Sequence, residues 1–550
     1  MRFISRHIQA LVLLAFAAIA VGATAISAFA DDDDAKKAES SGKVVPAAVS
    51  SKYFNAEEVK STGSVNVEGS SVGYDAVAGT LIVHPQGWDD TTAKAKDKDA
   101  DNNRDAEAAM FFVAYFKHGA DPAKRPITFL YNGGPGSATV WLHMGAFGPR
   151  RVVTANDTHT PAAPYNLVNN TYSLLDASDL VFIDAPGTGF SRMAGKDKEK
   201  AFWGVDEDAN AFADFIVEFL SKYGRWNSPK YLFGESYGTT RNANLVNILE
   251  TGRDIDFNGV IMLSEILNFD LSPDGPEYNP GVDLPYVLAL PTYAATAWYH
   301  HKLPGNPADL NKLLGEVQHF AMGDYASALS AGAALNTKQR NMIAAKLHQY
   351  TGLPVSYILK ADLRIDGGEF EKNLQDSSDT TTGRLDTRFS GPTMDPLSKE
   401  ADYDPQSAAI SSAYVSAFND YVRKQLHYGE GKTFKPEIDV FKSWDFLHTP
   451  PGVGQALSQS PNVIPDLSTA MKYNPDLKVM LNAGYFDLAT PYYEGVYEMR
   501  HLQIPRKLQS NIEIKFYRSG HMVYANEDAL KELHDNVAAF IGATDNQAGH

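Results

Sequence analysis

Short apolar runs alternate with amphipathic stretches through the first half of the chain. Strands are predicted at "GTLIVH", "AMFFVAYF", "PITFLY", "DLVFIDAP", "KYLFG" and "FNGVIMLSE". Between them, "NAFADFIVEFLSKYG" places its phenylalanines at helical spacing, and "RNANLVNILE" is compatible with a further helix. Because several of these strands are nearly all apolar, we expect a mostly parallel sheet with helices on both faces.

The pattern changes between about residue 268 and residue 477. Helical stretches such as "DLNKLLGEVQHFAMGDYASAL", "TKQRNMIAAKLHQY" and "AISSAYVSAFNDYVRKQLHYG" surround a polar segment, "NLQDSSDTTTGRLDTRFSGPTMD". Strand patterns then return in "KVMLNAGY" and "IEIKFYRSG". We therefore expect a core built from residues 51–268 and 477–550, interrupted by a largely helical cap at 269–476.

Composition narrows the possible functions. The chain has 550 residues, 44% of them hydrophobic, which is enough for a large core. Its net charge of −18, with no long basic run, argues against binding to nucleic acid or to anionic membranes. The sequence contains no cysteine, so disulfides, thiol catalysis and thiolate metal sites are excluded.

The N-terminus has the layout of a secretory signal peptide. Arg2 and Arg6 precede an apolar stretch, and Ala28-Phe29-Ala30 forms an A-x-A cleavage pattern before four aspartates. The alternative is an uncleaved membrane anchor. We expect residues 1–30 to be removed, residues 31–50 to form a flexible leader, and the protein to be secreted or periplasmic in a bacterial envelope.

The segment "YLFGESYGTT" places Ser236 in a G-x-S-x-G pattern between a predicted strand and a predicted helix. In α/β-hydrolases this pattern is a sharp turn that lifts the serine hydroxyl above the sheet. An ordinary glycine-rich turn would give the same five letters. The strand before it and the helix after it favour the nucleophile.

A nucleophilic serine needs a base and a group that orients the base. Asp487 follows one late strand and His521 follows the last, which is the chain order of α/β-hydrolases. Taken alone, Asp487 is better explained as a turn or N-cap aspartate, and His521 is equally well explained as a surface histidine. Their order and their positions at strand ends together favour the triad. The oxyanion donors expected with this triad are the backbone N–H groups of Tyr237 and of Gly134, in the loop "YNGGPGSA".

These motifs together resemble the serine carboxypeptidase family of the α/β-hydrolase fold. The resemblance rests on "NGGPGSA", "FIDAPGTGFSR", "GESYG", "NAGYFD" and "SGHMV", in that order between about residues 110 and 525. It implies that Asn132 and Glu235 help to hold the C-terminal carboxylate of a peptide. A second glutamate of the family is replaced by Ala146, which puts strict carboxypeptidase specificity in question.

The sequence therefore predicts an exported serine carboxypeptidase that forms an acyl-enzyme and needs no metal or cofactor. An esterase or acyltransferase would use the same triad, and a non-catalytic binding protein is a further alternative. We expect Glu235 to have a raised pKa, because two facing carboxylates must share a proton. Arg150 or Arg151 could instead supply a permanent positive charge for the substrate carboxylate.

Overall fold

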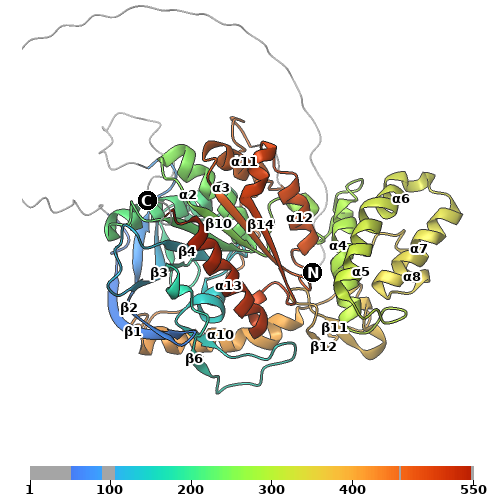
Figure 1. The fold of residues 1–550 in the computed structure, drawn as a ribbon, viewed down its shortest axis with the longest axis horizontal. Coiled ribbons are helices and arrows are strands. Elements are labelled where there is room, and N and C mark those ends of the chain that lie inside the picture. The colour runs from blue at the N-terminus through green and yellow to red at the C-terminus, as the bar shows by residue number, and fades with distance from the viewer. Residues whose placement is uncertain (1–50, 89–105, 457–459, 547–550) are drawn as a thin grey trace, which may run out of the picture. The chain divides into compact units, whose positions relative to one another are not determined.

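The computed structural model describes residues 51–88, 106–456 and 460–546 (Figure 1). The predicted signal peptide, residues 1–30, and the predicted leader, residues 31–50, lie outside the described residues. In the part that the structure describes, no helix is both long and apolar enough to cross a membrane.

The core is a single twisted sheet whose strands follow the order β1-β2-β3-β7-β4-β9-β10-β13-β14. The first three strands are antiparallel, and the strands from β7 to β14 run parallel to one another. The bounds are β1 Glu58–Val67, β2 Ser70–Val83, β3 Glu107–Lys117, β4 Ile127–Tyr131, β7 Asp179–Ile183, β9 Lys230–Glu235, β10 Gly259–Leu263, β13 Lys478–Gly484 and β14 Ile512–Tyr517.

Helices cover both faces of this sheet, as the apolar strands predicted. Successive residues of β9 show the two faces, because Tyr231 and Phe233 belong to one apolar cluster and Leu232 belongs to the other. The first cluster includes residues of α10 and α13, and the second includes residues of α2, α3 and α11. Their bounds are α2 Val205–Tyr223, α3 Tyr237–Arg253, α10 Pro405–Lys424, α11 Ile464–Tyr473 and α13 Glu527–Thr544.

The interval between β10 and β13 is largely helical. Besides α10 and α11, it contains the helices α4 Leu284–Tyr299, α5 Leu310–Phe320, α6 Ala326–Ala331, α7 Thr337–Thr351, α8 Val355–Lys360 and α9 Gly367–Asn373, with a small hairpin β11 Thr380–Thr382 and β12 Ser390–Pro392. Figure 1 shows α4 to α8 grouped at one side of the sheet. They form a third apolar cluster that includes Phe486 and Leu488, the neighbours of Asp487.

We propose that residues 269–476 are the insertion that the sequence predicted, with one qualification from packing. Helices α10 and α11 lie within this interval, yet their side chains complete the two clusters on the sheet. Cap and core are therefore interleaved along the chain, and α4 to α9 are the part that packs as a separate group.

Some elements had no clear signal in the sequence. Strand β1 and the short strands β5 Arg150–Val152, β6 Leu167–Asn169 and β8 Arg192–Ala194 were not predicted. Exposed and half-buried residues alternate along most of β1, so it lacks an apolar run. Helix α4 contains Pro291 in its interior, which normally argues against a helix. The remaining helices are α1 Lys198–Phe202 and α12 Tyr492–Arg500.

Several acidic side chains are buried in this core, and Glu250 of α3 is a clear case. Its Oε1 accepts hydrogen bonds from the N–H of Phe257 (3.2 Å) and from Nδ2 of Asn474 (2.9 Å). Among the described residues its Oε2 has no partner. Burial raises the pKa of Glu250 to about 8, so the folded protein holds this carboxyl in its neutral form near pH 7.

Replacing Glu250 by Gln is expected to reduce the pH dependence of stability. In the unfolded chain the pKa of this carboxyl is about 4.3, so unfolding at intermediate pH releases a proton. The contribution of Glu250 to the free energy of unfolding is therefore complete below the unfolded pKa. It is lost as pH rises towards the folded pKa, by at most about 1.4 kcal/mol per pH unit. Glu250→Gln keeps the Oε1 acceptor and removes the titration.

Urea unfolding at about pH 5 and about pH 8 measures this effect. The variant should lose less unfolding free energy than the wild type over that interval. Glu532→Gln, at an exposed position of α13, is the matched control. If Glu250→Gln lost as much unfolding free energy as the wild type between these two pH values, the assignment of a neutral buried carboxyl would be contradicted.

Candidate active site

Ser236 lies at a tight turn between β9 and α3, with backbone angles of φ 61° and ψ −131°. The two flanking glycines are required by crowding. A Cβ at Gly234 would lie 2.1 Å from the carbonyl oxygen of Gly238, and a Cβ at Gly238 would lie 2.9 Å from that of Tyr131. Any side chain at either position would overlap with backbone, so the turn around the serine demands glycine on both sides.

The loop after β4 packs directly on the N-terminus of α3. A Cβ at Gly133 would lie 2.4 Å from the backbone nitrogen of Tyr237, and Gly134 has a φ of 109° that favours glycine. Within the described residues, the N–H groups of Gly134 and Tyr237 have no hydrogen-bond acceptor. Two free donors near a helix N-terminus suit an oxyanion.

Asp487 and His521, which are far apart in the sequence, meet at the ends of β13 and β14. Nδ1 of His521 lies 2.8 Å from Oδ2 of Asp487, and both side chains are buried. The N–H groups of Ala489 and Thr490 donate to Oδ1 of Asp487 at 2.9 and 3.0 Å, and the Thr490 hydroxyl donates to Oδ2 at 2.8 Å. These bonds fix the carboxylate so that it can orient the imidazole.

The electrostatics at His521 suit a proton acceptor. Burial lowers the pKa of His521, but the charge and hydrogen bond of Asp487, with the charge of Glu235, outweigh it, and the net pKa is above the ordinary value. The hydroxyl of Ser264, just after β10, donates to the carbonyl oxygen of His521 at 2.7 Å. Asp487 therefore stabilises the protonated imidazole.

Glu235, next to the serine, is fully enclosed in a small polar network. The hydroxyl of Tyr524 donates to its Oε2 at 2.8 Å, and the side chain of Asn132 lies nearby. Burial raises the pKa of Glu235 to about 7, although the charge of His521, the hydrogen bond from Tyr524 and the nearby amide of Asn132 act in the opposite direction. The rise agrees with the predicted direction, and its cause in the structure is burial rather than a facing carboxylate.

A cavity of about 170 Å³ joins these groups. Asp487 lies behind His521 and is not among the residues that line it, and the ring of Tyr237 packs on Trp444 instead. The lining residues are Asn132, Gly133, Gly134, Ser137, Trp141, Glu235, Ser236, Arg384, Leu385, Ser407, Ser411, Glu437, His521 and Met522. Ser236, His521, the loop after β4 and Glu235 thus line one cavity.

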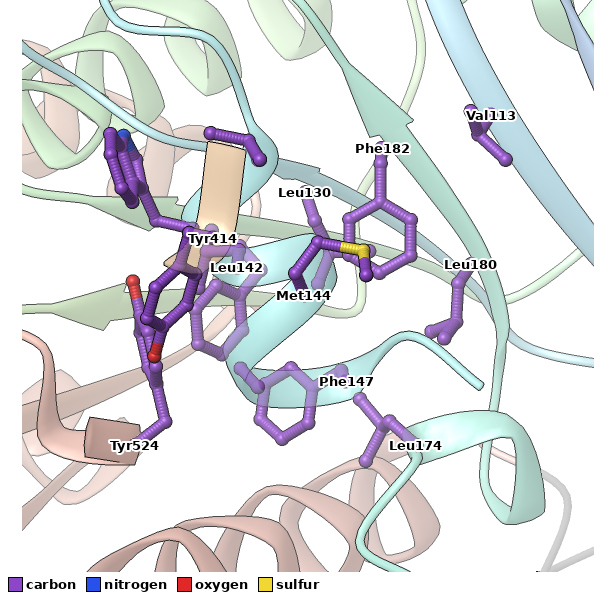
Figure 2. Packing of buried hydrophobic residues seen from close by; sticks show 14 of the residues in the cluster. Val113, Leu130, Leu142, Met144, Phe147, Leu174, Leu180, Phe182, Tyr414 and Tyr524 are labelled. Carbon is purple, nitrogen blue, oxygen red and sulfur yellow. The ribbon is translucent and has the colours of Figure 1, made fainter. Parts of the chain in front are cut away.

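Ala146 lies in the helical turn η1, Leu142–Phe147, where its methyl group joins the apolar core. The neighbouring Gly145 leaves room for two aromatic rings, since a Cβ there would lie 2.6 Å from Tyr524 and 2.7 Å from Tyr414. Figure 2 shows these two tyrosines side by side next to η1. The hydroxyl of Tyr524 therefore accompanies Glu235 at this place, and the second carboxyl that lines the cavity is that of Glu437.

The hypothesis that Arg150 or Arg151 faces the substrate is wrong. Neither residue is among those lining the cavity, and Nη2 of Arg151 donates to Oε1 of Glu527 at 2.7 Å. The cavity does contain a cation, Arg384, which the sequence did not reveal. Its guanidinium pairs with the carboxylate of Asp274, so its charge is already compensated.

One group of carboxylates away from the cavity has the spacing of a cation site: Glu277, Asp366 and Glu400. The ammonium group of Lys399 already lies among them, at 3.6, 3.8 and 3.1 Å. This group therefore carries its own counter-charge.

Comparison with known proteins supports the assignment drawn from these motifs. Residues 100–268 match the model of the serine carboxypeptidase family. Serine carboxypeptidase-like 3 of Arabidopsis thaliana is 27% identical over 196 residues, which are 34% of this chain and 41% of that protein. The carboxypeptidase Y homolog of Arthroderma benhamiae is 32% identical over 136 residues, 24% of this chain and 25% of that protein. The chain thus matches less than half the length of either relative.

The fold extends further than the sequence similarity. The crystal structure of KEX1(Δ)p, a prohormone-processing carboxypeptidase from Saccharomyces cerevisiae, superposes with a TM-score of 0.52 at 15% identity. The superposition covers 85% of this chain and 91% of that one. The chain therefore has the α/β-hydrolase fold and is related, through residues 100–268, to the serine carboxypeptidase family.

Proposed function

We propose that this protein is a serine carboxypeptidase that removes C-terminal residues from peptides. The observation that carries the proposal is the position of Glu235, a buried carboxyl with a pKa of about 7, beside Ser236 in the cavity that His521 also lines. A neutral carboxyl can donate a hydrogen bond to the free carboxylate of a peptide, which an ionised one would repel. The serine carboxypeptidase relatives support the same reaction.

In the proposed mechanism, Ser236, His521 and Asp487 act as nucleophile, base and orienting group. His521 takes the hydroxyl proton as the Ser236 oxygen attacks the peptide carbonyl, and Asp487 stabilises the imidazolium. The N–H groups of Gly134 and Tyr237 hold the oxyanion. His521 then gives the proton to the leaving amine, and water hydrolyses the acyl-enzyme through a second oxyanion.

Recognition of the substrate C-terminus falls to Asn132 and Glu235. The Asn132 amide can donate to a carboxylate at any pH, whereas Glu235 can donate only while it is protonated. Because Ala146 offers no second carboxyl, we propose a preference for free carboxylates that weakens as pH rises. An esterase or an acyltransferase would use the same triad without this preference, and a binding protein would show no turnover.

Replacing Ser236 by Ala is expected to lower kcat for a blocked dipeptide by roughly 10⁶-fold, the size of loss seen when a triad nucleophile is removed. Asp487→Asn should cost on the order of 10⁴-fold, because the imidazole loses its correct tautomer. Steady-state kinetics with matched circular dichroism spectra test both variants. Turnover near the wild-type rate in Ser236→Ala would exclude the proposed nucleophile.

The pH dependence of kcat/KM tests the role of Glu235. For a blocked dipeptide acid, kcat/KM should fall as pH rises through about 7, because the ionised carboxyl repels the substrate. Glu235→Gln should remove this fall, since an amide donates at every pH. Tyr524→Phe should move this fall to higher pH. The hydrogen bond from Tyr524 lowers the pKa of Glu235 in the wild type, so its removal raises that pKa.

The matching dipeptide amide is the control substrate, because it carries no terminal carboxylate. Its profile should lack the fall at neutral pH and should not change in Glu235→Gln. If the acid and the amide give the same profile, or if Glu235→Gln leaves the profile of the acid unchanged, the shared-proton account is wrong.

We further propose that the protein is exported to a bacterial envelope or beyond and acts on peptides or small acyl substrates, with no nucleic-acid partner and no lasting membrane anchor. The A-x-A pattern at Ala28 and Ala30 supports this. The mature chain should begin at Asp31. Intact-mass measurement of the envelope protein tests the proposal, and a mature chain starting at Met1 would contradict it.

A further inference from the structure

A short segment of the cap crosses the two loops that carry Asp487 and His521. It consists of residues 384–388, "RLDTR", and we refer to it as the strap. Three backbone hydrogen bonds join it to these loops: His521 N–H to Leu385 O (2.6 Å), Leu488 N–H to Arg384 O (3.0 Å) and Thr387 N–H to Phe486 O (2.9 Å). One segment thus binds the loop of the acid and the loop of the base.

Asp386, in the middle of the strap, adds a side-chain contact to the histidine loop. Its carboxylate is fully buried, and Oδ2 accepts the N–H of Gly520, directly before His521, at 3.1 Å. The guanidinium of Arg388 compensates this charge, with Nε 2.9 Å from Oδ1 of Asp386. Arg388 also donates to Oγ of Ser519 at 3.2 Å, so the pair holds two successive residues before the base.

Gly520 shows how closely the strap approaches. A Cβ at this position would lie 2.5 Å from Cβ of Asp386 and 2.5 Å from the carbonyl oxygen of Leu385. Such distances are not found for real Cβ atoms, so the backbone before His521 must be glycine for the strap to pass. The glycine of the "SGH" motif is therefore a consequence of this contact.

We propose that Asp386 is a positioning residue that holds the loop of His521 against the loop of Asp487. The inference rests on the proposed function, because it concerns the base of that reaction. Asp386 does not line the cavity and so acts through Gly520 rather than on the substrate.

Loss of the carboxylate would remove the acceptor of the Gly520 N–H and leave the charge of Arg388 buried without compensation. Only the backbone hydrogen bonds of the strap would then hold the loop of His521. A displacement of about 1 Å in a catalytic group can cost about 10²-fold in rate, so a loss of that size in kcat is expected for Asp386→Ala. A purely structural ion pair would change stability and leave the kcat of the folded enzyme unaltered.

The experiment measures kcat, the pH profile of kcat/KM and the melting temperature of Asp386→Ala. The acid limb of that profile reports the protonation of His521, which Asp487, Glu235 and Arg384 face. A looser contact with Asp487 should lower the pKa of His521 and move the acid limb to lower pH, because Asp487 then opposes the effect of burial less. Asp386→Asn/Arg388→Met keeps an oxygen acceptor for Gly520 and leaves no uncompensated charge, so it should recover most of kcat.

Asp179→Asn is the matched control. Asp179 is also buried and pairs with a buried arginine, Arg225, at 2.6 Å. It lies at the N-terminal end of β7, however, whereas Ser236 follows the C-terminal end of the parallel strand β9. This variant should lower the melting temperature while kcat and the acid limb stay as in the wild type. The proposal is overturned if Asp386→Ala behaves like Asp179→Asn in lowering only stability. Where Asp386→Ala does not fold, Asp386→Ala/Arg388→Met takes its place, because it removes the acceptor of the Gly520 N–H and leaves no uncompensated charge.

A readout that needs no substrate separates this inference from the proposed function. In the wild type, the Nδ1 proton of His521 should give a slowly exchanging, low-field NMR signal, because it is held by Asp487. In Asp386→Ala that proton should exchange faster. Absence of peptidase activity in the wild type would refute the proposed function alone, whereas an unchanged exchange rate in Asp386→Ala would refute the positioning role.

Discussion

The close backbone crossing at the turn around Ser236 is the constraint on which the site depends. The carbonyl of Gly238 occupies the space of a side chain at Gly234, and Gly133 lies against the start of α3. Because these backbones touch, the serine, the oxyanion loop and the helix N-terminus meet in one small volume. Parallel strands bring the other two residues of the proposed triad to the same edge of the sheet, since β10 pairs with β9, β13 with β10 and β14 with β13.

Burial shifts the pKa values of Glu235 and His521, two of the groups that line the cavity, and it acts on them in opposite directions. For Glu235, burial raises the pKa to about 7, so the carboxyl is neutral in mildly acidic solution. For His521, burial alone would lower the pKa, and the carboxylate of Asp487 reverses the effect. One site thus contains a carboxyl that burial keeps neutral and an imidazole whose protonated form Asp487 stabilises.

Local patterns sufficed to predict the apolar strands of the core, the turn at Ser236 and the loops of Asp487 and His521. Each of these signals lies within a few neighbouring residues, so periodicity and glycine spacing reveal them. The strap, residues 384–388, could not be predicted, because its polar sequence is that of an ordinary loop and its partners lie 99 or more residues further along the chain. Tyr524 was missed for the same reason, since its contact with Glu235 exists only after folding.

Covalent labelling tests the central claim most directly, because it needs no knowledge of the substrate. A fluorophosphonate reacts fast with a serine that is activated by a base and faces an oxyanion site. Peptide mapping by mass spectrometry should find one adduct per chain, on Ser236, with a labelling rate that falls when His521 is protonated. An adduct on a different serine, or a folded protein that takes up no label, would contradict the account.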